Sequence, residues 1–449
     1  MTMNAFASSN SPLTREAMEP FWLPMTPNRQ FKSKPRIFVG AEGMHYITDD
    51  NRRILDGMAG LWCVNAGHAQ RRIVEAIQAQ AAKLDFVSSF QMSHPAAFEL
   101  ARRITEIAPD GLDHVFFTNS GSESVDTALK IARGYHRARG EASRIRFISR
   151  AKAYHGMGWG GLSVSGIVRH RRDFGPLLPE VDHLPHTHNS EHAAFSRGQP
   201  QWGAHLADEL SKLLQVHDPS TVAAVIVEPV TGSGGVLPPP VGYLERLRQI
   251  CDQNGILLIF DEVITGFGRL GAAFGANAFG VTPDLITCAK GMTNAAVPMG
   301  GVITSDKVYD ALMQGPDNTI ELFHGYTYSA HPLACAAGLA ALDVYQDLGL
   351  FERARRLAPV WENHAHALRD LPHVVDIRNI GLLAAIDLKA REGAPGARGS
   401  ECASRCYEED SILIRSSGDT LLISPPLIIE GEQIEEIFAA IHRALITVS

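Results

Sequence analysis

Short apolar runs alternate with amphipathic patterns through the middle of the chain. Between the runs, apolar residues recur at helical spacing, as at Val125, Leu129, Ala132 and Tyr135. This alternation predicts an α/β domain with a mainly parallel sheet, in which ligands bind beyond the carboxyl ends of the strands. The residues that end each strand are therefore the first candidates for function. We expect buried strands at His114–Thr118, Arg146–Ser149, Ala223–Glu228, Ile256–Asp261, Asp284–Ala289 and Gly300–Thr304.

The pattern changes near both ends of the chain. Two long helical stretches, Leu333–Asp347 and Leu350–Leu371, lie toward the C-terminus. Short strands near Ile380–Asp387 and Ile412–Arg415 follow them, which predicts a smaller α+β domain. Near the N-terminus, Phe38–Ile47 reads as a strand hairpin that joins this smaller domain. We expect an N-terminal segment of the small domain, a large domain and a C-terminal small domain at residues 1–64, 65–330 and 331–449.

Composition narrows the class of protein. The chain has 449 residues, of which 45% are hydrophobic and 20% are charged, and its formal net charge is −8. Because it lacks the basic surface that nucleic-acid binding needs, we expect small-molecule partners. The six cysteines are scattered without a CxxC pair, which argues against a disulfide framework or a zinc site and favours a reducing cytoplasm.

Neither a secretory signal nor a membrane span is expected. The segment Met1–Pro20 has no cationic stretch followed by an apolar run, so it does not resemble a signal peptide. The most apolar stretch, Leu333–Leu342, is far shorter than the roughly 20 residues that a membrane-spanning helix needs.

The segment after the first predicted strand has the chemistry of an anion-binding turn. Thr118–Ser124 is rich in serine and opens a helix, so its hydroxyls and backbone N–H groups lie at the positive helix end, where a phosphate is stabilised. An ordinary serine N-cap explains the same residues, and turn chemistry alone favours that interpretation. Other strand ends must decide between the two.

Two further strands end in charged residues. Asp261 closes an apolar strand, where a buried carboxylate needs a cationic partner, either an arginine or the protonated pyridine nitrogen of pyridoxal phosphate (PLP). Lys290 follows another apolar strand. A desolvated lysine has a lowered pKa and a nucleophilic amine that can form a Schiff base, although a lysine at a strand end is more often exposed. Because about one strand–connection–strand unit separates the two residues, both side chains can reach one ring.

Five motifs extend this pattern along the chain, at Ser120–Glu123, Tyr154–Gly156, Glu228–Pro229, Asp261–Arg269 and Ala289–Lys290. In their order and residue types they resemble the class III (ω-amino) aminotransferases, which are PLP enzymes of fold type I, and the resemblance covers most of the chain. Two further segments are similar to the branch that contains the β-alanine:pyruvate aminotransferases, namely Leu61–His68 and His324–Pro332.

The resemblance implies a large PLP-binding domain with a mainly parallel sheet, a smaller α+β domain, and a role for each matching residue. Lys290 would carry PLP as a Schiff base, Asp261 would pair with the pyridinium nitrogen, and Tyr154 would stack on the ring. The other implied cofactor-binding residues are Ser120, Gly121, Ser122, His155, Glu228, Val263 and Thr327.

The resemblance also implies an activity and an assembly. Such an enzyme moves an amino group from an ω-amino acid or amine, such as β-alanine, to pyruvate, and so yields an aldehyde or ketone and alanine. Arg415 would bind the substrate carboxylate and Trp62 would line the substrate pocket, although a solvated arginine and a packed aromatic explain the same residues. Thr327 would reach the phosphate in the neighbouring subunit, which implies a homodimer or tetramer with shared active sites.

A dinucleotide-binding dehydrogenase is a competing interpretation. Gly266–Gly271 matches the GxGxxG pattern and follows a strand. However, Asp261 and Glu262 would repel a pyrophosphate, and we expect no helix in the glycine-rich segment 271–283. A related PLP enzyme such as an aminomutase and a non-catalytic scaffold are further alternatives.

The three histidines of His183–His188 raise the question of a metal site. Pro185 breaks any helix that could place two of them on one face, and no carboxylate or thiol cluster accompanies them in the sequence. We therefore predict a polar surface loop and no metal.

Overall fold

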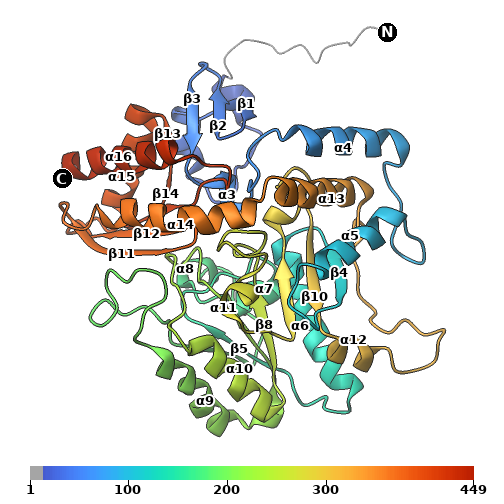
Figure 1. Ribbon diagram of the computed structural model, residues 1–449. Helices are drawn as coiled ribbons and strands as arrows, with labels where there is room; N and C mark the ends of the chain where they lie inside the picture. The colour runs from blue at the N-terminus through green and yellow to red at the C-terminus, as the bar shows by residue number, and fades with distance from the viewer. Residues whose placement is uncertain (1–13) are drawn as a thin grey trace.

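The computed structural model describes residues 14–449, and a seven-stranded sheet lies at its centre (Figure 1). The strand order is β4-β10-β9-β8-β7-β5-β6. Strand β10 is antiparallel to β4 and β9, and all other neighbours are parallel. These strands are β4 (His114–Thr118), β5 (Arg146–Arg150), β6 (Val181–Leu184), β7 (Val222–Val227), β8 (Leu257–Asp261), β9 (Leu285–Cys288) and β10 (Gly300–Thr304).

The sequence pattern predicted six of these strands and missed the seventh. Each expected run falls on a strand, and the mainly parallel sheet is confirmed. The exception is β6, whose residues Val181–Leu184 alternate apolar and polar side chains at the edge of the sheet. The prediction that His183 belongs to a surface loop was therefore wrong, because an edge strand lacks the apolar run that marks a central one.

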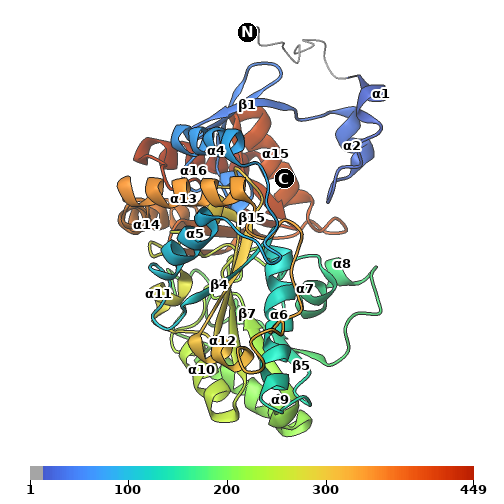
Figure 2. The ribbon, with the colours of Figure 1, turned by 90° about the vertical axis from the view of Figure 1, so that its right-hand side faces the viewer.

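Helices cover both faces of the central sheet (Figure 2). Leu258 and Phe260 of β8 share a hydrophobic cluster with helix α10, while Leu257 and Ile259 share another with helix α6. Burial on both faces explains why the central strands read as continuous apolar runs. The helices of this part of the chain are α4 (Arg71–Lys83), α5 (Pro95–Thr105), α6 (Gly121–Ala138), α7 (Trp159–Val164), α8 (Val168–Arg171), α9 (Glu209–His217), α10 (Tyr243–Asn254), α11 (Gly275–Phe279) and α12 (Asp306–Leu312).

Two smaller sheets and the C-terminal helices lie beyond one end of the large sheet (Figure 1). One sheet has the order β1-β2-β3-β13, and its parallel pair β3–β13 joins the N-terminal hairpin to the C-terminal part of the chain. The other has the order β11-β12-β15-β14 and is antiparallel. The domain boundaries at residues 64 and 330 stay a prediction. The strands are β1 (Phe38–Glu42), β2 (His45–Thr48), β3 (Arg53–Asp56), β11 (Val374–Ile380), β12 (Leu383–Leu388), β13 (Ile412–Leu413), β14 (Arg415–Ser417) and β15 (Thr420–Ile423).

The remaining helices include the two long stretches expected near the C-terminus. In residues 14–449 no single helix is both long enough and apolar enough to cross a membrane. Helices α13 and α14 pass that test only as a pair, and the pair is bent by 57°. The bounds are α1 (Arg15–Met18), α2 (Asn28–Ser33), α3 (Ala59–Trp62), α13 (Pro332–Asp347), α14 (Leu350–His366), α15 (Ala397–Asp410) and α16 (Gly431–Thr447).

Candidate active site

A cavity of about 290 Å³ lies beyond the carboxyl ends of the large-sheet strands. Residues that follow β4, β7, β8 and β9 form its floor, and strands β14 and β15 contribute to its wall. The topology thus brings together residues that are more than a hundred positions apart in sequence. The candidate residues that line it are Trp62, Ser120, Gly121, Ser122, Tyr154, His155, Glu228, Asp261, Val263, Lys290 and Arg415.

Lys290 lies on the floor of this cavity, in the turn directly after β9. Its backbone has a φ of 49°, a left-handed conformation that a lysine adopts only where the surrounding fold enforces it. No carboxylate in residues 14–449 lies within 4.0 Å of its ammonium group. Burial lowers the pKa of Lys290 to about 8, although nearby Cys63 and Asp261 act in the opposite direction. About a tenth of the amine is therefore neutral near pH 7, far more than for an ordinary lysine, and a nucleophilic amine requires this neutral form.

Asp261 ends β8 and is buried beside His155. The Oδ2 atom of Asp261 lies 2.7 Å from Nδ1 of His155, while Oδ1 accepts hydrogen bonds from the Thr287 hydroxyl at 3.1 Å and the Val263 N–H at 3.2 Å. Among the described residues no lysine or arginine pairs with Asp261, and Nε2 of His155 is buried without a partner. A buried carboxylate held mainly by a histidine can still attract a cation in the cavity.

Glu228 follows β7 and fixes the neighbouring backbone. Its carboxylate accepts hydrogen bonds from the N–H groups of Tyr154, at 3.0 Å, and Gly232, at 2.8 Å. Burial raises the pKa of Glu228, and the nearby His155 partly offsets this effect. Glu228 therefore holds Tyr154 at the cavity wall, where the Tyr154 ring meets the edge of His170 at a centroid distance of 5.3 Å.

The serine turn after β4 is built for close approach to a ligand. Ser120 caps helix α6, and its hydroxyl accepts a hydrogen bond from the Glu123 N–H at 3.2 Å. A Cβ atom at Gly121 would lie 2.9 Å from Val263, and one at Gly156 would lie 2.5 Å from the Ser122 hydroxyl oxygen. Only glycine fits at these positions, so the turn packs closely against its neighbours, while Ser120–Ser122 at the start of the 18-residue helix line the cavity.

Trp62 and Arg415 also line the cavity and lie close to each other. Lys290 Nζ lies 5.3 Å from the centre of the Trp62 ring, and the Arg415 guanidinium lies 5.6 Å from it. Trp62 also has a left-handed φ, of 59°. Arg415 forms no ion pair with any described residue. Thr327 is exposed and does not line this cavity.

Several lining residues lie outside the sequence motifs, among them Met25, Arg169, His170 and Ser233. They come from short or irregular segments, and only the tertiary fold brings these segments to the cavity. Arg169 and His170 lie in α8, a helix of four residues.

The GxGxxG segment has a different role from the one in dinucleotide-binding proteins. Contrary to our expectation, a short helix, α11, does lie within 271–283, at Gly275–Phe279. The anion at its N-terminus is the carboxylate of Glu262, which accepts hydrogen bonds from the N–H groups of Gly275 and Ala276. A pyrophosphate has no place where this carboxylate already lies.

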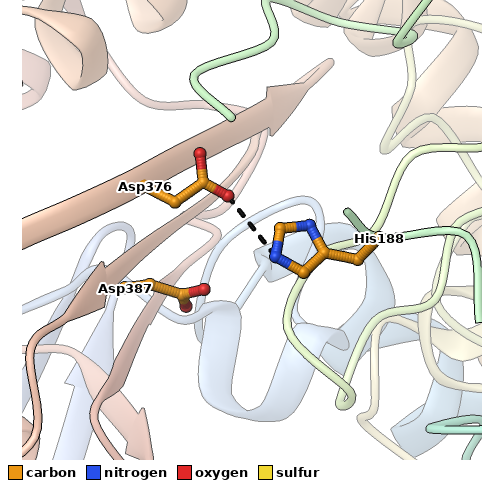
Figure 3. A group of neighbouring side chains, drawn as sticks. All are labelled: His188, Asp376 and Asp387. Carbon is orange, nitrogen blue, oxygen red and sulfur yellow. Dashed lines mark ion pairs between the residues drawn. The ribbon is translucent and has the colours of Figure 1, made fainter. Parts of the chain in front are cut away.

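The histidine-rich segment lies against strands β11 and β12 and does bring carboxylates together. Atoms of His188, Asp376 and Asp387 lie within 4.8 Å of one another (Figure 3). However, the guanidinium of Arg378 donates hydrogen bonds to both carboxylates, at 2.8 and 2.9 Å for Asp387. We call these four residues the Arg378 cluster. Because the guanidinium already supplies the positive charge, the arrangement is that of an ion-pair network.

The donor set of the cavity fits PLP on three counts. The open end of α6 with its serine hydroxyls suits a phosphate, the unpaired Lys290 amine suits an aldehyde, and the Asp261 carboxylate suits a protonated ring nitrogen. Residues Ser120, Ser122, Asp261 and Lys290 would hold the cofactor, with Tyr154 at its ring.

Comparison with known proteins identifies the family. The aminotransferase class-III family model matches residues 28–445. The omega-aminotransferase of Caulobacter vibrioides is 58% identical over 428 residues, which cover 95% of this chain and 97% of that protein. The beta-alanine–pyruvate aminotransferase of Pseudomonas aeruginosa is 48% identical over 94% of this chain and 95% of that protein. A solved amine transaminase from an uncultivated Pseudomonas species, in its PLP-bound form, superposes with a TM-score of 0.89 at 35% identity, over 96% of this chain and 99% of the other.

Proposed function

The chain belongs to the class III aminotransferases and is a PLP-dependent transaminase, and on this premise we propose that it transfers the amino group of an ω-amino acid or a simple amine to pyruvate. The observation that carries the proposal is the convergence of the Lys290 amine, the Asp261 carboxylate and the serine turn on one cavity. The relatives named for omega-amino and beta-alanine transamination support the choice of donor and acceptor.

The protein's own residues position the reaction and move its proton. When bound, PLP supplies an aldehyde that captures amino groups and a pyridinium ring that stabilises the electrons of the broken C–H bond. Lys290 would hold the cofactor through its amine, and the same amine, when free, would carry the proton away from the donor carbon. Asp261 would hold a proton on the ring nitrogen, and His155 fixes the position of the Asp261 carboxylate. Tyr154, at the cavity wall, would contact the ring.

Arg415 would orient the substrate. Its guanidinium lines the cavity and forms no ion pair with any residue of 14–449, so it suits a substrate carboxylate through a bidentate hydrogen bond. The Trp62 ring lies close to both Arg415 and Lys290, so it limits the width available to the donor.

We further propose that the active enzyme is a homodimer, in which Thr327 reaches the phosphate bound by the neighbouring subunit. Exposed Thr327 lies in a region where large apolar side chains are also exposed, as is typical of a protein–protein interface. Light scattering should give twice the chain mass of 48.8 kDa or a higher even multiple. The exposed apolar residues are Phe86, Phe90, Met92, Phe98, Phe323 and Tyr328.

A cytoplasmic location fits the cysteines. All six lie within the described residues and are free thiols. Proteins of oxidising compartments more often pair such residues in disulfides.

The experiment that tests this function is a donor panel with pyruvate. Purified holoenzyme is incubated with β-alanine, other ω-amino acids or simple amines, and the alanine formed is measured. We expect alanine from at least one donor of these classes and none when Lys290 is replaced. Absence of alanine with every donor would refute the proposal.

A further inference from the structure

Two guanidinium groups line the active-site cavity, and the proposed reaction uses only one of them. Arg415 comes from β14, whereas Arg169 comes from helix α8. The side chain of Arg169 forms no ion pair or hydrogen bond with any residue of 14–449. Its neighbours differ in this respect, because Arg172 pairs with Asp173 at 3.0 Å and Arg171 lies 3.5 Å from a nitrogen of His183.

Arg169 and Arg415 both line this cavity, and both side chains are exposed to solvent. Loss of hydration in the cavity lowers the pKa of Arg415, Tyr154 acts in the opposite direction, and the charge of Arg169 lowers the pKa further. His170, whose ring meets the Tyr154 ring, has its pKa lowered by burial and then by the charges of both arginines. His170 is therefore uncharged, and the positive charges at this wall are the guanidinium groups of Arg169 and Arg415.

The acidic residues that line the cavity do not neutralise the charges of Arg169 and Arg415. Asp261 is bound to His155, and Glu228 accepts hydrogen bonds from two backbone N–H groups. Both lie on the floor, at the ends of large-sheet strands. Two like charges at one wall repel each other, and a ligand with two carboxylates removes this repulsion and gives each guanidinium a bidentate partner.

We propose that Arg169 forms a second carboxylate subsite, so that the enzyme also accepts short dicarboxylic 2-oxo acids, such as 2-oxoglutarate, as amino acceptors. The proposal rests on the proposed function, because Arg415 is taken to bind the carboxylate beside the reacting carbonyl. Arg169 then binds the distal carboxylate. His170 has a buried Nδ1 atom without a partner among the described residues, and it lies beside this subsite.

The reaction balances as in transamination to pyruvate. The donor carbon loses its amino group and one hydrogen and is oxidised, while the acceptor carbon gains both and is reduced by the same electron pair. The acceptor oxygen leaves as water, and water supplies the oxygen of the carbonyl product. No outside oxidant or reductant is required, and the dicarboxylic 2-oxo acid becomes the corresponding 2-amino acid.

A matched pair of acceptors tests the subsite. 2-Oxopentanoate has a methyl group where 2-oxoglutarate has its distal carboxylate. The ratio of kcat/KM for 2-oxoglutarate to that for 2-oxopentanoate is measured for the wild-type holoenzyme and for Arg169→Gln. We expect the ratio to fall about tenfold in the variant, as the loss of one charge-assisted contact predicts. An unchanged ratio would overturn the proposal.

Binding without turnover gives an independent readout. Calorimetric titration of the holoenzyme with glutarate and with pentanoate should show tighter binding of glutarate, and Arg169→Gln should remove most of that preference. Arg172→Gln is the matched control, since Arg172 is exposed at the end of the same helix and pairs with Asp173. This control should keep both the preference and the activity with pyruvate.

The two proposals can fail separately. If no amine donor transfers its amino group to pyruvate, the proposed function fails, and the glutarate titration still decides the role of Arg169. If pyruvate is a good acceptor but the wild-type protein binds glutarate no more tightly than pentanoate, the second subsite is refuted and the proposed function stands.

Discussion

The active-site floor and the Arg378 cluster both bury charged side chains, but they satisfy them in opposite ways. In the Arg378 cluster, one guanidinium hydrogen-bonds to two carboxylates and to the Gly235 carbonyl, at 2.9 and 3.1 Å. On the active-site floor, Lys290 has no carboxylate within ion-pair distance among residues 14–449. The first arrangement completes its interactions within the fold, whereas the second leaves them for a ligand.

The pKa shifts follow the same division. Hydrogen bonds and ion pairs with Asp387 and Asp376 raise the pKa of Arg378 despite its burial, and Arg378 in turn lowers the pKa of Asp387. Lys290 shows the opposite shift, since burial dominates and lowers its pKa to about 8. Buried charge alone therefore does not mark a functional site. An uncompensated buried charge in a cavity does mark a functional site.

Replacing Lys290 should give the largest difference between the active-site floor and the Arg378 cluster, measured as loss of activity. On the proposed function, Lys290→Ala would remove both the cofactor attachment and the proton carrier, so alanine formation from an amine and pyruvate should fall at least about 10⁴-fold. The fold should persist, because no charge partner is left behind. Lys212→Ala, at an exposed lysine of α9, is the control and should keep full activity. Residual activity within tenfold of wild type would show that Lys290 is not the catalytic lysine.

Replacing Arg378 should have the reverse outcome. Arg378→Met leaves Asp376 and Asp387 without their guanidinium and should lower the free energy of unfolding by about 3–5 kcal/mol. The free energy is measured by urea unfolding of the holoenzyme. Arg405→Met removes a partly exposed arginine that pairs with Glu401, and we expect little change in stability.

A second measurement sharpens this result. The Gly235 carbonyl that Arg378 binds belongs to the loop that carries Ser233 to the cavity wall. Folded Arg378→Met should therefore show a raised KM with a kcat close to that of the wild type. A stable variant with a strongly reduced kcat would contradict the division between a structural cluster and a catalytic floor.

Much of the floor could be predicted because its residues end central strands. A central strand in a sheet covered on both faces is a continuous apolar run, so Asp261 and Lys290 interrupt a clear pattern. The serine turn after β4 follows the same rule. The local sequence therefore predicts both the strand and the position of the candidate residue at its end.

The rest of the site and the cluster depends on contacts between distant segments. Arg169 lies in a four-residue helix without a motif, and nothing near it in sequence indicates that β14 lines the same cavity. Strand β6 is polar enough to resemble a loop. The carboxylates beside His188 lie nearly 200 residues further along the chain, which is why the sequence showed histidines without acidic neighbours.

The smallest expected effect concerns the pH dependence of stability in the cofactor-free protein. Burial lowers the pKa of Lys290 in the fold to about 8, below the value of roughly 10.4 for an unfolded chain. Between these values the unfolded state binds more protons, so the contribution of Lys290 to stability becomes more favourable as the pH rises. Lys290→Met should therefore be more stable than the wild type at pH 7, and the difference should shrink toward pH 10.

Urea unfolding of both apoproteins at several pH values measures this difference. Lys83→Met, at an exposed lysine that ends α4, is the control and should differ from wild type by the same small amount at every pH. A constant gap between Lys290→Met and the wild type from pH 7 to pH 10 would mean that Lys290 is compensated within the fold. The active-site floor would then resemble the Arg378 cluster, and the contrast between the two regions would rest on geometry alone.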